Sequence, residues 1–181
     1  MKRLTVMVSL SLFARLLVAQ ELDISPLVGE TWYGVYMSGQ KSGYAVNNVE
    51  KNEDGSVSVS EDAQFRIRME SVKQDMRIYS KRTYAPDGAL SGVSTRVEAM
   101  GGEQQYDAVV KGDKLLMRTV VGGEAQETEL PRPAESLQDA FKQIELIQNG
   151  GEVGSELRYT IFEPMYRQEI NGVSKIIAIE E

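Results

Sequence analysis

The chain contains no cysteine and no histidine among its 181 residues. Without cysteine it can form no disulfide, no thiolate nucleophile and no cysteine-ligated metal site. Without histidine it lacks the usual general base near neutral pH and the commonest zinc ligand. These absences exclude Cys-His-Asp and Ser-His-Asp catalysis within the chain. We therefore expect a protein that is not an enzyme and that holds no metal and no cofactor.

Basic residues are also scarce. Lysine and arginine number 20 against 27 aspartate and glutamate, so the formal net charge is −7. Nucleic-acid binding needs a net or local basic field, and we expect no nucleic-acid partner. The apolar share of 41% is sufficient for a hydrophobic core, and the length fits one domain.

The N-terminal segment, residues 1–19, has the pattern of an export signal. Lys2 and Arg3 supply a positive start, and a mostly apolar stretch follows. That stretch is shorter than the ~20 apolar residues of a typical spanning helix. We expect cleavage after residue 19, export to the periplasm or beyond, and a single β-rich domain over residues 20–181. An uncleaved N-terminal membrane anchor is the alternative.

From residue 30 onward the apolar pattern has a period of two. In "FRIRM", Phe65, Ile67 and Met69 fall on one face of a strand, and Arg66 and Arg68 fall on the other. Turn signals such as "NEDG", "PDG" and several glycine pairs recur at intervals of roughly ten residues. This pattern predicts a mainly β protein, a curved antiparallel β-meander or half-barrel of about 8–10 strands.

One segment departs from this rhythm. "AESLQDAFKQIELIQ" predicts an amphipathic helix over residues 134–148, and Ser136 with Asp139 resembles a capping box. Its apolar stripe is expected to pack on the sheet and comprises Leu137, Ala140, Phe141, Ile144 and Ile147. "SELRYTIFEP" and "VSKIIAIEE" predict two final strands.

The stretch "ETWYGVYMSGQKSGYA" combines four aromatic residues with a short glycine-containing loop. In an extended strand Trp32 and Tyr36 face one way and Tyr33 faces the other. This split favours a hairpin that packs into the core, with Trp32 buried. The alternative is a ligand-contacting patch formed by Trp32, Tyr36 and Tyr44, because indole and phenol offer apolar area and a donor. Gly43 indicates a place where a neighbouring backbone comes close.

A locally basic stretch lies between residues 66 and 96 of this acidic protein. Alternation predicts that Arg66, Arg68 and Arg77 share the outer face of the sheet, where they form a candidate site for an anionic partner. The interpretation we favour is structural, with these arginines paired across strands to aspartate and glutamate.

Several segments in order resemble a known domain: "WYGVYMSGQKSGYA", "FRIRMESVKQDMRIYSKRTY", "DGALSGVSTRVEAMGGEQQYDAVVKGDKLLMRTVVGGEAQETELP" and "GSELRYTIFEPMYRQEINGVSKIIAIEE". Together they resemble the N-terminal β-rich accessory domain of bacterial secreted transglutaminase-like proteins over residues 30–181. In that family a papain-like core with catalytic cysteine, histidine and aspartate follows. This chain has neither cysteine nor histidine, so no catalytic residue can be transferred. The resemblance implies a non-catalytic accessory domain whose partner is a downstream or separately encoded transglutaminase-like catalytic domain.

A second function remains open. A bent sheet with a helix across it is similar to periplasmic lipid- or lipoprotein-binding half-barrels, by analogy of fold alone. A lipid cavity would then be lined by Phe65, Ile67, Met69, Met76, Ile78, Leu115 and Met117. The size of these side chains favours a filled interior over a cavity.

Overall fold

The computed structural model describes residues 23–37, 39–69, 72–99, 102–148 and 152–175. The predicted signal peptide, residues 1–19, lies outside these ranges, so cleavage and export remain predictions. Residues 176–181 of the expected last strand also lie outside them. Within the described part, no helix has the length and apolar character needed to cross a membrane.

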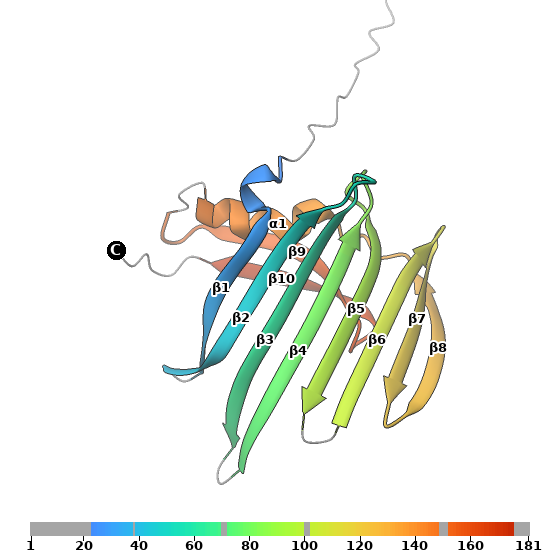
Figure 1. Ribbon diagram of the computed structural model, residues 1–181. Helices are drawn as coiled ribbons and strands as arrows, with labels where there is room; N and C mark the ends of the chain where they lie inside the picture. Colours follow the sequence, from blue (N-terminus) through green and yellow to red (C-terminus); the bar gives the residue numbers. More distant parts are fainter. Residues whose placement is uncertain (1–22, 38, 70–71, 100–101, 149–151, 176–181) are drawn as a thin grey trace, which may run out of the picture.

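The fold is mainly β, as the sequence predicts, with eight strands in one sheet and two in another. The large sheet runs in simple order from β1 to β8, and it is not closed (Figure 1). After the short 3-10 helix η1 (Ser25–Leu27), its strands are β1 (Gly29–Met37), β2 (Gln40–Lys51), β3 (Val57–Met69), β4 (Val72–Tyr84), β5 (Leu90–Ala99), β6 (Gly102–Lys111), β7 (Lys114–Val121) and β8 (Glu124–Pro131). Helix α1 (Leu137–Gln148) follows, and β9 (Glu156–Glu163) and β10 (Gln168–Lys175) form the second sheet.

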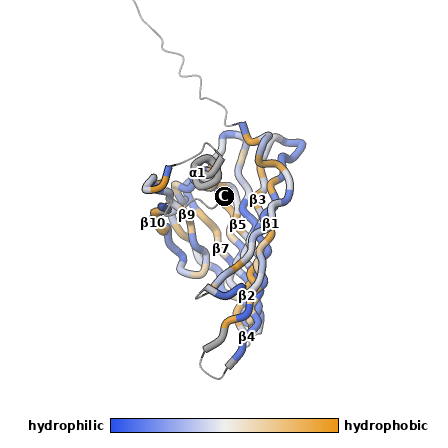
Figure 2. Tube along the Cα trace, turned by 90° about the vertical axis from the view of Figure 1, so that its left-hand side faces the viewer, coloured by the Kyte–Doolittle hydropathy of each residue, from blue (hydrophilic) through white to orange (hydrophobic). Residues whose placement is uncertain are grey.

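One face of the large sheet is covered and the other is open. Seen from its edge, the sheet carries α1, β9 and β10 on one side only (Figure 2). We call the side beneath these elements the covered face and the opposite side the open face. Every strand pair is antiparallel, and residues directly opposite each other point to the same face.

The core lies on the covered face. Tyr84, Leu90, Leu115 and Met117 of the large sheet are almost wholly buried and form one cluster with Phe141 of α1. Phe162 of β9 also belongs to this cluster. The helix therefore packs directly on the sheet, as expected, and the small sheet closes over part of the same surface.

Helix α1 begins at Leu137, three residues later than the predicted start at residue 134. The Ser136 Oγ accepts a hydrogen bond from the Asp139 backbone N–H at 3.3 Å and donates one to the Asp139 carboxylate at 2.8 Å. Ser136 is thus the N-cap, because its side chain satisfies a donor that has no partner within the helix. The side chains of Leu137 and Phe141 are buried as predicted, and those of Ile144 and Ile147 lie outside the described part.

Of the two C-terminal strands, β9 falls within the expected "SELRYTIFEP" segment, and the last strand differs from the prediction in position. The second strand of the small sheet begins at Gln168, five residues before the expected "VSKIIAIEE" segment. Its first part, "QEING", shows no strong apolar alternation, and it is extended because it pairs with β9 from Glu163 to Tyr159. Pairing with a neighbour, rather than its own pattern, determines this strand.

At Gly43 the backbone of the neighbouring strand β3 lies very close. A Cβ atom added there would lie 1.9 Å from the Gln64 carbonyl oxygen and 2.6 Å from the Phe65 Cα. No real side chain tolerates such distances from backbone atoms. The expectation of a close backbone approach at this glycine is confirmed.

Candidate functional site

A cleft of about 830 Å³ lies between the covered face and the layer formed by η1, α1 and the β9–β10 sheet. Val49 and Val59 of the large sheet form part of its floor, and Phe141 and Ile161 line it from the cover. This volume lies within the range of ~300–1,000 Å³ typical of small-molecule sites. The cleft is open to solvent at its rim, where Thr31 is exposed, so it does not test the expectation of a filled interior.

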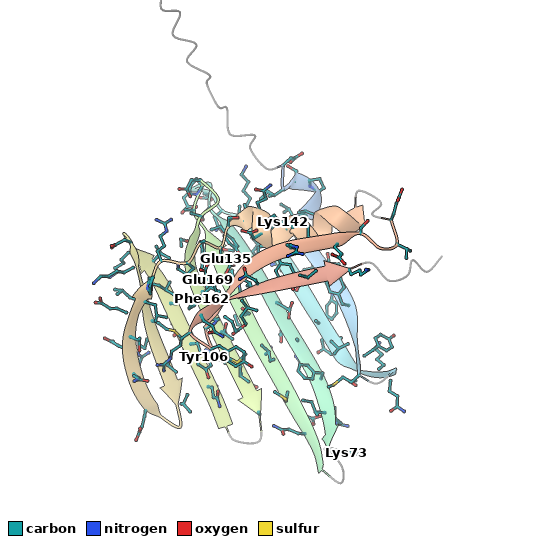
Figure 3. All side chains as sticks on the ribbon, turned by 180° about the vertical axis from the view of Figure 1, so that it is seen from behind. Lys73, Tyr106, Glu135, Lys142, Phe162 and Glu169 are labelled. Atoms are coloured by element: carbon teal, nitrogen blue, oxygen red, sulfur yellow. The ribbon has the colours of Figure 1, made fainter. Side chains whose placement is uncertain are left out.

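A buried polar cluster holds the cover to the sheet beside this cleft. Glu135, just before α1, is almost fully buried, and its Oε1 accepts hydrogen bonds from Arg82 Nε at 3.1 Å and from the Tyr84 hydroxyl at 2.6 Å. Its Oε2 accepts one from the Phe162 backbone N–H at 2.6 Å. One carboxylate thus joins β4, β9 and the segment that leads into the helix. Figure 3 shows Glu135 and Phe162 close together where β9 crosses the sheet.

Arg82 completes this cluster. Its Nη2 donates a hydrogen bond to the Phe162 carbonyl oxygen at 2.8 Å, and its Nη1 donates to the Ser80 Oγ at 2.9 Å. Burial, together with the negative charge of Glu135, raises the pKa of the Tyr84 phenol well above its ordinary value. The phenol therefore stays protonated and keeps donating to the carboxylate.

A row of polar side chains crosses the covered face next to this cluster. Asn47 lies opposite Thr31 on one side and Glu61 on the other. Glu61 in turn lies opposite Ser80. The complete row, from β1 to β8, is Thr31, Asn47, Glu61, Ser80, Thr95, Tyr106, Thr119 and Gln126. Its members from β1 to β5 all line the cleft, so the floor of the cleft is not simply apolar.

Three of the aromatic residues predicted as a site come together on the open face. Trp32 and Tyr44 lie with their ring centroids 5.6 Å apart and their planes tilted by 33°. The Tyr36 ring lies over Gly34, since a Cβ there would be 2.7 Å from the Tyr36 Cε2. We call Trp32, Tyr36 and Tyr44 the aromatic patch. Their exposed fractions are 64%, 65% and 40%, respectively.

The prediction that Trp32 is a core residue is therefore wrong. Alternation correctly separates it from Tyr33, but Tyr33 is the residue on the covered face, where it lines the cleft. No described element packs over the face that carries Trp32. The hairpin exists as expected, and its largest aromatic side chain points to solvent.

The predicted basic site is neutralised by cross-strand ion pairs. Arg66 binds Asp75 in a two-point contact of 2.5 and 2.9 Å, and Arg77 binds Asp62 in the same way at 2.9 and 2.7 Å. Their guanidinium groups lower the pKa values of both aspartates. Arg66 and Arg77 lie on the open face as predicted. The side chain of Arg68 lies outside the described part, and its backbone pairs with Lys73.

A second, broader depression of about 1,090 Å³ lies near the ends of β2, β3 and β4. Tyr44, Arg66 and Arg77 line it, and Asp75 also contributes. These side chains are exposed, and the two arginines are already paired with aspartates. The depression therefore offers no free positive charge at Arg66 or Arg77, and we regard the covered cleft as the better candidate site.

The apolar residues expected to line a lipid cavity are mostly elsewhere. Of that set only Ile78 lines the cleft. Leu115 and Met117 are buried in the core cluster, and Phe65, Ile67 and Met76 line the broader depression. The side chain of Met69 is not described. The cleft is instead lined by valines, Phe141 and the polar row.

Sequence reasoning missed Glu135 and assigned no role to Arg82. Strand alternation contained the signal for Arg82, because it shares a face with Tyr84 and Ile78. No local signal marks Glu135, whose partners are 27 to 53 residues away in sequence. No group of three or more residues suited to hold a metal ion occurs in the described ranges.

Comparison with protein-family models, with curated proteins and with solved structures gave no match for this chain.

Proposed function

We propose that the protein is an exported, non-catalytic binding protein that carries an amphipathic ligand in the cleft beneath its cover. The cleft of about 830 Å³ is the observation that carries this proposal. A domain that only supports a catalytic partner has no use for such a space, because the apolar side chains around an unfilled space lose packing contacts with one another. A carrier needs it to receive the apolar part of its ligand.

The geometry provides both parts of an amphipathic site. Val59, Ile78 and Ile161 supply apolar contact, and the polar row runs alongside them. The small cover of α1, β9 and β10 is tied to the sheet by the Glu135 cluster at one end. The ligand therefore enters between two layers that are already held in place.

Fluorescence titration with 1-N-phenylnaphthylamine, a neutral apolar probe, tests this proposal. Wild-type protein should enhance its emission in a saturable, equimolar manner, because the ring system leaves water. Ala140→Trp fills the cleft from α1 and should abolish the enhancement. Gln138→Trp adds the same side chain at an exposed position on the same helix and is the matched control.

A second variant that fills the cleft controls for misfolding of Ala140→Trp. Thr31 is exposed at the rim of the cleft, so Thr31→Trp leaves the core intact and should also lower probe binding. Circular dichroism checks that each variant is folded. Absence of saturable binding by the wild type, or equal binding by all four proteins, would overturn the carrier proposal.

The accessory-domain interpretation is the second candidate, and the aromatic patch favours it. Exposed tryptophan and tyrosine side chains are enriched in protein–protein interfaces. The partner would be a transglutaminase-like catalytic chain encoded next to this one. If so, the two purified proteins should co-elute, and Trp32→Ala combined with Tyr36→Ala should separate them. Lys114→Ala, at an exposed ion pair of β7, is the control. Co-elution that survives the aromatic double substitution would contradict a role for the patch.

A further inference from the structure

The charged side chains that line the cleft are almost all acidic. In the described part of the chain, the only basic residue among them is Arg82. The acidic residues are Glu30, Glu61, Glu135, Asp139 and Glu163. The cleft thus presents a negative potential to any ligand that enters it, and a low-dielectric wall strengthens such a potential.

Arg82 is not free to bind an anionic ligand. Glu135 neutralises its charge at 3.1 Å, and its remaining hydrogen bonds go to Ser80 and the Phe162 carbonyl. A ligand carboxylate would have to compete with Glu135 for the guanidinium and break the contacts that hold the cover. An anionic head group is therefore disfavoured in this cleft.

One of the carboxylates is available to a ligand. Asp139 is paired with Lys142 and Ser136, and Glu163 accepts the Met165 backbone N–H. Glu30 pairs with Asn48, so the alternation of β1 directs its carboxylate to the open face. Glu61 makes no hydrogen bond or ion pair with any residue of the described ranges. Glu61 lies in the polar row on the floor of the cleft, with Asn47 and Ser80 as its cross-strand neighbours.

Asn47 gives an independent indication of what Glu61 would bind. Its Oδ1 atom is buried and has no hydrogen-bond partner in the described structure. An unsatisfied buried acceptor is unfavourable unless a donor reaches it. Asn47 and Glu61 together offer a neutral acceptor and a carboxylate side by side, which is the pattern that an ammonium group with several N–H donors satisfies.

Resting on the proposed carrier function, we propose that the cleft selects amphiphiles with a cationic amine head group. The amine lies on the polar row between Asn47 and Glu61. The apolar chain lies along Val59, Ile78 and Ile161, which line the cleft and are only partly buried. Discrimination against acids comes from repulsion by the Glu61 carboxylate, which disfavours an anionic head group as well as favouring a cationic one.

Competition against bound 1-N-phenylnaphthylamine by three ligands with the same chain tests the head group. The ligands are dodecylamine, dodecanol and dodecanoate, each below its micellar concentration and near neutral pH. Dodecylamine should displace the probe at a concentration about tenfold lower than dodecanol. Dodecanoate should be the weakest competitor. Added salt should reduce the difference in affinity between dodecylamine and dodecanoate, because it screens the charges.

The Glu61→Gln variant tests whether Glu61 causes the preference for the amine. It should bring dodecylamine close to dodecanol, because a neutral amide of nearly the same shape replaces the carboxylate. Glu127→Gln removes the same charge from the open face, where Glu127 lies opposite Arg118, and should leave the preference intact.

The outcomes separate this inference from the carrier proposal. If the probe binds and dodecanoate competes as well as dodecylamine, or none of the three ligands competes, the inference is wrong and the carrier proposal stands. An amine preference that Glu61→Gln does not change would also contradict it. If the probe itself does not bind, the carrier proposal fails.

Discussion

The buried cluster of Glu135 provides the sharpest test of how the cover is held. Glu135→Ala would leave the Arg82 guanidinium buried without its counter-charge, and would remove the partner of the Tyr84 hydroxyl and of the Phe162 N–H. Removing one member of a buried ion pair typically costs about 3–5 kcal/mol of the free energy of unfolding. Glu135→Gln keeps the shape and one acceptor, and should cost about 1.5–3 kcal/mol, the contribution of hydrogen bonds to a charged group.

A double-mutant cycle separates the ion pair from simple loss of packing. Arg82→Met and Glu135→Leu should each be destabilising alone, because each leaves one charge buried. The double variant should lose less free energy of unfolding than the sum of the two single losses, by at least about 2 kcal/mol. The reason is that it leaves neither charge unpaired.

Urea unfolding followed by far-UV circular dichroism is the suitable assay. Fluorescence would report poorly, since Trp32 is largely exposed in the folded state. The slope of the transition must stay constant for the free energies to be compared. A cost below about 1 kcal/mol for Glu135→Ala, or strict additivity in the cycle, would refute the reasoning that this carboxylate holds a buried charge.

Two further predictions concern single residues. Trp32→Ala should lower the free energy of unfolding by less than about 1 kcal/mol, because its side chain is exposed and its main contact is one aromatic pair; urea unfolding that shows about 3–5 kcal/mol would place it in a core after all. The raised pKa of Tyr84 means that the folded state retains its proton at a pH where the unfolded state loses it. Stability should therefore decrease as pH rises above about 10, the ordinary tyrosine value, and Tyr84→Phe should show a smaller decrease in parallel urea titrations; equal slopes for both proteins would contradict the assigned cause.

The sequence alone was sufficient for the meander and its turns. Alternation with a period of two defines the two faces of each strand, and turn residues such as those of "NEDG" and "PDG" specify where the chain reverses. Asn52 and Gly55 close the first of these turns with a 3.0 Å hydrogen bond, and Gly88 adopts a positive φ of 81° in the second. These are local preferences, so no distant contact is needed to predict them. The Ser136 N-cap is also predictable from local sequence, because Ser136 and its partner Asp139 are only three residues apart.

Which face of the sheet becomes buried was decided only by tertiary structure. Alternation separates Trp32 from Tyr33, but both are aromatic, so it does not say which of the two faces inward. The buried face is the one on which α1, β9 and β10 pack. These elements come after the whole sheet in the sequence, so no local pattern in β1 indicates their position. Their position on one side leaves Trp32 and Arg77 in solvent and buries Arg82 against Glu135, since a charge is stable in the interior only beside its partner.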